Sequence, residues 1–348
     1  MTLKPLVETA FGRPTKRKPV WFLRQAGRYL PEYMAIRKNT EFTTLCQTPK
    51  LAAEVTLQPL RRYDVDAAII FSDILVPCMG MGQTLTFGKG HGPILNKPVR
   101  SAEDLASLRV PDCEKELGYV GDAIGLTKQG LESHQTMIGF AGAPFTVASY
   151  MIEGMGTKVY TEVKNLQHNH PTVFQGLLDK LVEVSVDYLL MQVKAGAECL
   201  MLFDTWANQL PAEDYRNYSF PAVSKIIAEV KDKADVPIVY YPGQGTDLYF
   251  ELSGYQGDVI AVDWRTRMSR AISLLENSGL DVSVQGNLDP QTLMGPESVI
   301  RERTRAILDQ GKKARGHIFN VGHGMQPHLS PDALHHVINE IRSWESEQ

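Results

Sequence analysis

Eight short apolar runs, most of them followed by a stretch with helical periodicity, limit most strongly how this chain can fold. Each run is continuous rather than alternating, which is typical of strands covered by helices on both faces of a parallel sheet. The predicted strands are Pro19–Leu23, Asp66–Phe71, Thr136–Phe140, Glu198–Phe203, Pro237–Tyr241, Val259–Val262, Val282–Gln285 and His317–Val321. The predicted helices include Pro49–Arg62, Pro171–Ala195, Ala212–Lys233, Pro296–Gln310 and Pro331–Trp344.

Eight strands that alternate with helices favour an α/β fold, a single (β/α)8 barrel, over an open doubly wound sheet. An open sheet of this kind carries a glycine-rich phosphate loop after its first strand. Here the first run is followed by Arg24-Gln25-Ala26-Gly27-Arg28, which is not such a loop. We therefore expect one barrel domain over residues 1–348, with a hairpin-like insertion around residues 80–95.

Composition excludes several classes of protein. The formal net charge is −4, from 36 basic and 40 acidic residues, which disfavours a nucleic-acid partner. The four cysteines show no Cys-x-x-Cys or His-x-Cys spacing, so we predict neither a disulfide framework nor a metal site. No apolar segment is long enough for a signal peptide or a membrane helix, which predicts a cytoplasmic protein without a membrane partner.

The carboxyl ends of the predicted strands direct attention to Arg24, Asp73 and His323, because in a barrel these ends build the active site. An arginine drawn toward the barrel mouth needs an anion, since an unpaired buried charge is costly. Its planar fork of donors matches a carboxylate. Arg24 could instead form a structural ion pair with Glu32 or with a carboxylate of the barrel.

Purely structural roles are also possible for Asp73, His323 and a third candidate, Tyr150. Asp73 could accept N–H groups from a ligand or act in acid–base chemistry, but it could equally cap a helix or pair with an arginine. His323, between Gly322 and Gly324, could be a turn histidine bonded to the backbone. Tyr150 could be a core tyrosine whose hydroxyl is satisfied.

Two segments are distinctive enough to resemble a known family. Pro19–Tyr33, which contains RQAGR followed by PEY, and Gly139–Gly154 are similar to the two signatures of the uroporphyrinogen decarboxylase family. Phe71–Leu75, Phe203–Trp206 and Asn320–Gly324 resemble three further blocks of that family, in the same order. The resemblance extends from about Pro5 to Ile341.

The resemblance implies a single (β/α)8 barrel, usually a homodimer, that works without cofactor or metal. Its substrate is uroporphyrinogen III, whose four acetate side chains lose CO2 to give coproporphyrinogen III. The implied catalytic residues are Asp73, Arg24 and Tyr150, and the implied substrate-binding residues are Arg24, Gln25, Arg28, Arg37, Phe71, Asp73, Tyr150, Phe203, Thr205 and His323.

Within that set, the resemblance gives several residues a specific role. The arginines Arg24, Arg28 and Arg37 meet substrate carboxylates, so positive charge would be concentrated there despite the acidic total. Asp73 faces the four pyrrole N–H groups, and Thr205 stands where some members have serine, which keeps a hydroxyl. The sequence leaves open whether Arg24 donates the proton or positions a water or a substrate carboxyl.

Two other functions remain alternatives at this point. A methyltransferase of the same barrel superfamily would hold zinc through a His-x-Cys pair and a distant cysteine, and this chain has no His-x-Cys. A non-catalytic barrel that binds tetrapyrroles would not need both signatures intact.

Overall fold

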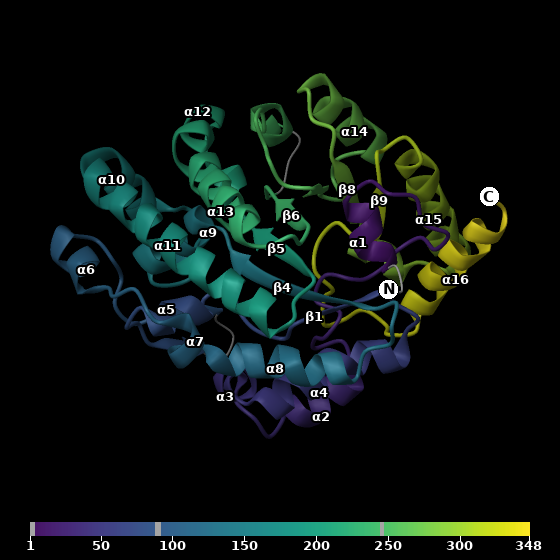
Figure 1. The fold of residues 1–348 in the computed structure, drawn as a ribbon, viewed down its shortest axis with the longest axis horizontal. Helices are drawn as coiled ribbons and strands as arrows, with labels where there is room; N and C mark the ends of the chain where they lie inside the picture. Colours follow the sequence, from purple (N-terminus) through teal and green to yellow (C-terminus); the bar gives the residue numbers. More distant parts are fainter. Residues whose placement is uncertain (1–3, 88–91, 244–246) are drawn as a thin grey trace.

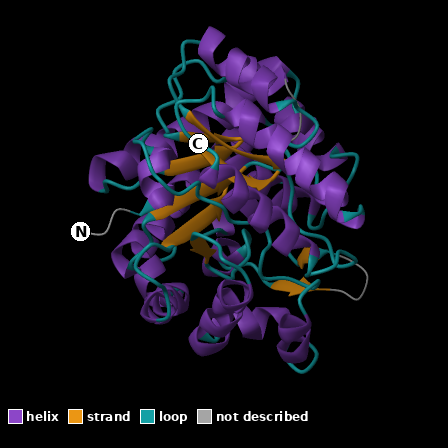
Figure 2. Cartoon of the chain, turned by 90° about the vertical axis from the view of Figure 1, so that its right-hand side faces the viewer, coloured by secondary structure: helices purple, strands orange, loops and turns teal. Residues whose placement is uncertain are grey.

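The computed structural model describes residues 4–87, 92–243 and 247–348, and its centre is a curled parallel sheet of seven strands. The strand order is β1-β4-β5-β6-β7-β8-β9, so each strand pairs with the next one along the chain. Helices cover the outer face of this sheet (Figures 1 and 2), as expected when right-handed crossovers join parallel strands. The strands are β1 (Ala67–Ile69), β4 (Thr136–Gly142), β5 (Cys199–Phe203), β6 (Ile238–Tyr241), β7 (Val259–Ala261), β8 (Ser283–Leu288) and β9 (His317–Val321).

Helices that precede, separate or follow these strands surround the sheet. In the first third of the chain they are α1 (Pro5–Ala10), α2 (Pro31–Arg37), α3 (Phe42–Gln47), α4 (Pro49–Arg62), α5 (Val76–Gly80), α6 (Ala102–Ser107), α7 (Cys113–Glu116) and α8 (Gly118–Gln129). After β4 they are α9 (Pro144–Glu153), α10 (Thr161–Asn169), α11 (Pro171–Ala195), α12 (Ala212–Asp214), α13 (Phe220–Lys233), α14 (Met268–Asn277), α15 (Glu297–Gly311) and α16 (Ala333–Ser346). Short 3-10 turns cover Ala207–Gln209, Asp247–Glu251 and Pro290–Met294.

Seven of the eight predicted strands are confirmed, but the prediction of a regular first strand, Pro19–Leu23, is wrong. This segment makes only a single parallel bridge, between Val20 and Phe319. The Trp21 N–H donates to Phe319 O of β9 (3.3 Å), whereas side-chain oxygens take three other backbone N–H groups of the segment. Val20 N–H donates to Asp66 Oδ2 (2.8 Å), Phe22 N–H to Gln25 Oε1 (3.1 Å) and Leu23 N–H to Asn320 Oδ1 (2.9 Å).

The predicted helix Ala212–Lys233 is interrupted. Its first residues form α12, Tyr215–Ser219 form a π-helical turn, and α13 begins at Phe220. Pro221 lies in the first turn of α13, where its missing N–H needs no partner. By contrast, α4 and α11 have the predicted boundaries, since both begin at a proline in the first helical position.

A second, small sheet follows α5. Its strands β2 (Leu85–Phe87) and β3 (Pro93–Leu95) pair in antiparallel register, with Thr86 opposite Ile94. This pair lies within the segment where an insertion was predicted, of which residues 88–91 lie outside the described residues.

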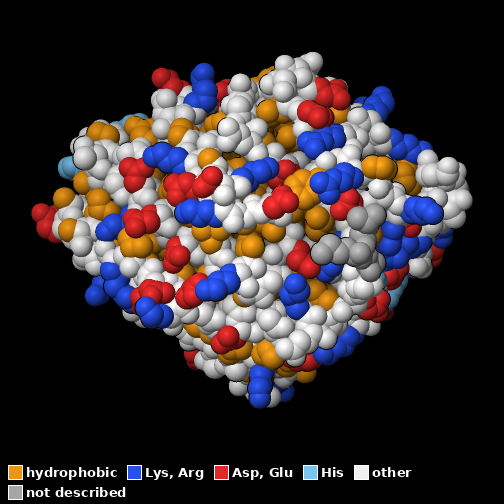
Figure 3. All heavy atoms as spheres, in the orientation of Figure 1, with side chains coloured by type: hydrophobic (Ala, Val, Ile, Leu, Met, Phe, Trp, Pro, Cys, Tyr) orange, Lys and Arg blue, Asp and Glu red, His pale blue; other side chains and the backbone are white. Residues whose placement is uncertain are grey.

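The surface and the helices bear on which partners are possible. Basic and acidic side chains are interspersed over the face drawn in Figure 3 rather than gathered by sign. Across the described ranges, no helix is both long and apolar enough to cross a membrane.

Candidate active site at the carboxyl ends of the strands

Arg24 occupies a sharp turn that ends the segment beside β1 and β9. Its φ is 59°, in the left-handed region that residues other than glycine rarely adopt. Gln25 N–H donates to Phe22 O (2.9 Å) to close the turn, and Met325 N–H donates to Leu23 O (2.9 Å). The Arg24 side chain is exposed and lies against Gly324, where an added Cβ would come within 2.4 Å of Arg24 Cδ. The glycine after His323 therefore makes room for the arginine.

Gln25 differs from the other predicted site residues. Its side chain is only 1% exposed, Oε1 accepts from Phe22 N–H and Nε2 donates to Ala67 O (2.9 Å). Both ends of the amide are used to hold the turn against β1. Both ends of the amide therefore bond within the chain next to Arg24, and a ligand contact of Gln25 stays a prediction.

Arg28 and Arg37 follow on the next turn and on α2. Arg28 is exposed and, within the described part of the chain, forms no ion pair. Arg37 Nη1 donates to Thr40 O (2.8 Å). Glu32, the partner considered for Arg24, instead pairs with Arg62 at 2.8 and 3.0 Å. The structural alternative for Arg24 thus fails for Glu32.

Asp73 lies four residues beyond β1. Its Oδ1 accepts the Leu75 N–H at 2.8 Å, and no side chain in the described residues donates to it. Burial raises the pKa of Asp73, and the Leu75 N–H and the nearby Arg24 oppose that rise. Next to it, Phe71 packs against Tyr33 and Phe42, each with ring centroids 5.6 Å away. Asp73 is therefore a carboxylate with one backbone donor and with Arg24 within electrostatic reach.

Tyr150 on α9 belongs to the same electrostatic neighbourhood. Its ring centroid is 6.1 Å from that of Trp206, and the side chain is half-buried. Burial raises the pKa of Tyr150, Asp73 adds to the rise and Arg24 opposes it. The three predicted catalytic residues, two from loops and Tyr150 from α9, thus lie within electrostatic reach of one another.

The end of β5 carries Phe203 and Thr205 on either side of a buried carboxylate. Phe203 packs edge-on against Phe140 of β4, with centroids 5.6 Å apart. Asp204 is fully buried and accepts from the Thr146 hydroxyl (2.7 Å), the Tyr240 hydroxyl (3.0 Å) and the Ser219 hydroxyl. Asp204 was not among the predicted site residues. The Thr146 hydroxyl of this network also accepts the Trp206 N–H at 3.1 Å, which joins α9 to the segment around Thr205.

His323 lies in the loop after β9. Burial, and after it Arg24, lowers the pKa of His323, which favours the neutral ring. Its Nδ1 is buried without a partner in the described residues. At Gly322 an added Cβ would lie 2.3 Å from Trp264 N, so this loop is pressed against the loop after β7.

Two further residues were not among the predicted site residues, Tyr241 at the end of β6 and Arg265 beyond β7, and the charges of Arg24 and Arg265 both act on the Tyr241 phenol. Both stand at strand ends, which was the available signal. Tyrosines and arginines that follow strands are common, however, and their side-chain surroundings cannot be read from sequence.

Other candidate sites lie elsewhere or are missing from the described chain. A hollow of about 980 Å³ lies between the start of α4, α8 and the end of α11, and no predicted site residue lines it. All four cysteines are buried and free. Over residues 4–87, 92–243 and 247–348, no three His, Cys, Asp or Glu side chains come together as a metal ion would require.

Comparison with known proteins finds one family whose similarity covers nearly the whole chain. The model of the family described as uroporphyrinogen decarboxylase (URO-D) matches residues 1–344. The uroporphyrinogen decarboxylase of Geobacter sulfurreducens is 41% identical over 95% of this chain and 96% of its own. That of Trichlorobacter lovleyi is 42% identical over 94% of each chain, and that of a Roseiflexus species 41% identical over the full length of both. A solved methyltransferase from Methanosarcina mazei shares the fold, with a TM-score of 0.82 over 98% of each chain but 17% identity.

Proposed function

Because the chain belongs to the uroporphyrinogen decarboxylase family, we propose that it removes the carboxyl groups of the four acetate side chains of uroporphyrinogen III. The products are coproporphyrinogen III and CO2, which makes the chain a carboxy-lyase. The observation that carries this proposal is a carboxylate, Asp73, within electrostatic reach of an exposed arginine that has no acidic partner in the described residues. Asp73 lies beside Arg24 with one backbone N–H as its donor, and Arg28 is free of ion pairs within the described residues.

The arginines bind the substrate through its carboxylates. Uroporphyrinogen carries eight of them, of which only one reacts at a time. A guanidinium offers parallel N–H donors that match a carboxylate and stays charged at neutral pH. Arg24, Arg28 and Arg37 can therefore hold carboxylates that are not reacting, and that binding orients the reacting acetate.

The substrate supplies its own electron sink. A proton adds to the pyrrole carbon next to nitrogen and gives a cation that extends over the N–H. The bond from the acetate methylene to its carboxylate then breaks, CO2 leaves, and the electron pair enters the ring system as an exocyclic double bond. A proton adds to the methylene carbon to give a methyl group, and the ring proton is lost. The net change replaces a carboxylate by hydrogen.

Asp73 stabilises that cation. A carboxylate facing the pyrrole N–H groups is set in place before charge develops, and such preorganised electrostatics is often the largest catalytic contribution. Burial without substrate raises the pKa of Asp73. Four N–H donors from the substrate would favour the ionised form and lower it again. Tyr150 and His323, both near Arg24, complete the polar surroundings.

We also propose that the chain is one domain whose sheet closes into an eight-membered barrel. The support is the segment Pro19–Leu23, which lies between the two edges of the seven-stranded sheet. Phe319 N–H donates to Pro19 O (2.8 Å) on the β9 side, and Asp66 N–H donates to Val20 O (2.8 Å) just before β1. The family resemblance supports a homodimer, which sedimentation analysis of the purified chain tests directly.

The decisive experiment is an anaerobic assay with uroporphyrinogen III. We expect products with seven, six, five and finally four carboxyl groups, separated by chromatography after oxidation, without added metal or cofactor. Substrate with all eight carboxyls intact would contradict the proposal. Stoichiometric zinc in the purified protein together with methyl transfer would favour the methyltransferase instead.

A further inference from the structure

Tyr241, the last residue of β6, has a buried hydroxyl without a partner. The side chain is 4% exposed, and its oxygen finds no donor or acceptor in the part of the chain that the structure describes. A buried polar group that makes no hydrogen bond costs free energy, so such a group in a native protein calls for an explanation. Its place at the carboxyl end of the sheet suggests that a ligand atom completes it.

Arg265, beyond the end of β7, is held in one orientation by its neighbours. Its guanidinium carbon lies 4.3 Å from the centroid of the Trp264 ring, and Nη1 donates to Asp263 Oδ2 at 3.0 Å. Its backbone N–H donates to Asp263 Oδ1 at 2.9 Å. Nearly half of the side chain remains exposed, and its Nε and Nη2 make no hydrogen bond in the described residues. This arginine is therefore preorganised, and within the described structure its Nε and Nη2 remain available to donate to a ligand.

The loop that carries Arg265 is fastened to the rest of the site. Asn287 Nδ2 donates to Asp263 O (3.0 Å) and to Thr266 O (2.6 Å), which ties the loop to β8. Gly322, just after β9, lies so close to Trp264 that an added Cβ would be 2.3 Å from Trp264 N. A loop held at both ends keeps its arginine in place, as a binding site on a rigid scaffold requires.

Tyr241 and Arg265 belong to one neighbourhood. β6 and β7 are adjacent parallel strands, with Tyr240 opposite Ile260, so their carboxyl ends lie side by side. Burial raises the pKa of the Tyr241 phenol and lowers that of the His323 imidazole, and the charges of Arg24 and Arg265 contribute a lowering at both groups. Two cations therefore lie within electrostatic reach of a tyrosine and a histidine, each of which has a buried polar atom without a partner in the described residues.

We propose that Arg265 and the Tyr241 hydroxyl form a second carboxylate subsite, distinct from Arg24, Arg28 and Arg37, that binds a propionate of the substrate. This rests on the proposed function. A propionate is favoured over an acetate because propionates keep their charge through all four reactions. A fixed arginine that need not release its carboxylate between steps can hold the macrocycle while another acetate is presented.

The test compares three variants, Tyr241→Phe, Arg265→Gln and Arg267→Gln, with the parent chain. Arg267 is exposed, makes no ion pair in the described residues and serves as the matched charge control. A hydrogen bond to a charged group contributes on the order of a tenfold change in binding. We therefore expect the KM for uroporphyrinogen to rise roughly tenfold in Tyr241→Phe and in Arg265→Gln, with kcat within about twofold of the parent.

The product separates propionate from acetate. Coproporphyrinogen keeps the four propionates, so its inhibition constant should rise in both variants by the same factor as KM. A rise in KM without a rise in this inhibition constant would overturn the propionate assignment. Unchanged KM in Tyr241→Phe, in a parent chain that turns over uroporphyrinogen, would overturn the subsite alone. A parent chain without turnover would instead overturn the proposed function.

Thermal unfolding controls for structural damage. Removing an unpartnered hydroxyl should leave the Tm of Tyr241→Phe unchanged or slightly higher. Arg265→Gln leaves the buried Asp263 without its cation and can lose stability. Tyr241→Phe therefore gives the clearest test of the subsite, because its KM can change without a loss of stability.

Discussion

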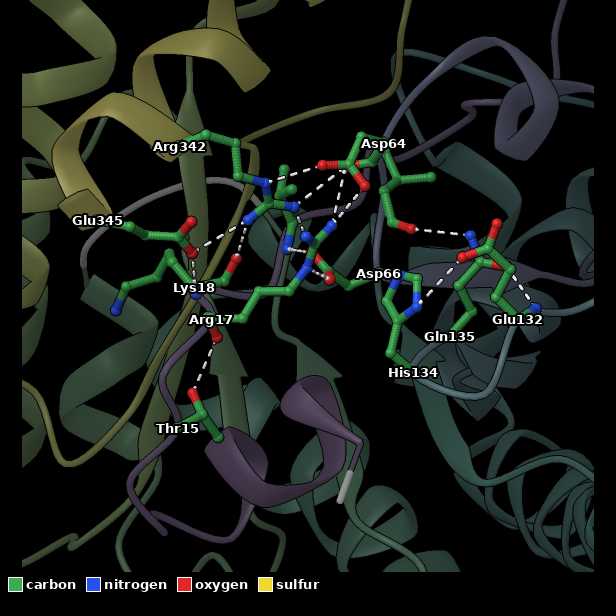
Figure 4. A network of polar contacts seen from close by, with 12 residues as sticks. Thr15, Arg17, Lys18, Asp64, Asp66, Glu132, His134, Gln135, Arg342 and Glu345 are labelled. Carbon is green, nitrogen blue, oxygen red and sulfur yellow. Dashed lines mark hydrogen bonds and ion pairs between the residues drawn. The ribbon is translucent and has the colours of Figure 1, made fainter. Parts of the chain in front are cut away.

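The two ends of the parallel sheet use the same charged residue types in opposite ways. At the amino end, Arg17 and Arg342 bind Asp66, which is fully buried, and Asp64 (Figure 4). At the carboxyl end, Arg24 and Arg28 have no acidic partner in the described residues. A charge whose partner lies within the chain stabilises the fold, whereas a charge left unpaired is available for a ligand.

Geometry enforces this difference. Asp66 precedes β1, and its carboxylate also accepts the Val20 N–H, so it joins the N-terminal segment to α16 through Arg342. Asp73, which follows the same strand, accepts one backbone N–H from the described part of the chain. The ends of a single strand thus separate a carboxylate that holds the fold together from the one to which we assign a catalytic role.

The largest expected effect comes from Asp73→Asn. A neutral amide cannot offset the ring cation, so we expect kcat to fall about 10³-fold, comparable with the loss of a preorganised catalytic group. The amide oxygen can still accept the Leu75 N–H, so the fold should survive. Single-turnover kinetics with uroporphyrinogen measure the effect, and turnover near that of the parent would remove Asp73 from the mechanism.

The same variant sharpens the comparison through its stability. Burial raises the folded pKa of Asp73 above its unfolded value, so the folded state binds the extra proton and its relative stability falls as pH rises through that range. Asp73→Asn should therefore unfold at an equal or higher Tm at pH 7. The gain should vanish at a pH below the unfolded pKa. A lower Tm at pH 7 would mean that Asp73 is a structural residue.

A smaller effect is expected from Arg24→Lys. The lysine keeps the charge but loses the fork, and its ammonium cannot bind a carboxylate with two parallel N–H groups. We expect kcat/KM to fall about 10²-fold, with little change in Tm because no internal partner is lost. Kinetics like those of the parent chain would reduce Arg24 to a general positive charge.

At the amino end, Asp66→Asn should affect stability and spare chemistry. It leaves Arg17 and Arg342 short of a buried partner, and both are partly exposed, so water relieves part of the cost. We expect a loss of about 2 kcal/mol in the free energy of unfolding with unchanged kcat. Chemical denaturation and steady-state assays measure the two quantities. A matching loss of kcat at full folding would break the division between the two ends.

Lys18→Met should give the smallest effect. Burial lowers the pKa of Lys18 to about 8, and Glu345 partly opposes this. The cost of keeping Lys18 charged is thus fully present below pH 8 and is relieved as pH rises from about 8 toward the unfolded value. The variant should be slightly more stable at pH 7, with the difference shrinking above pH 8 in a series of melting curves.

Much of the fold could be predicted because strands buried on both faces of a parallel sheet appear in the sequence as continuous apolar runs. The predicted strand His317–Val321 has the same boundaries as β9. Helices α4 and α11 begin at Pro49 and Pro171, as predicted. Pro19–Leu23 reads like the other runs, yet side chains of Asp66, Gln25 and Asn320 take its N–H groups. Those acceptors are distant in sequence or act across a turn, so the pattern could not reveal them.

The site divides in the same way. Local apolar runs and the polar residues that end them were enough to single out Arg24 and Asp73, which lie within electrostatic reach of each other. Contacts between distant segments settle which polar groups bond within the chain. Both ends of the Gln25 amide bond to the backbone, and Asp204 is buried among three hydroxyls. The Tyr241 hydroxyl has no partner in the described residues, with Arg24 and Arg265 within electrostatic reach. The physical reason is that hydrogen-bond partners are set by distances between loops, which the order of residues along the chain does not contain.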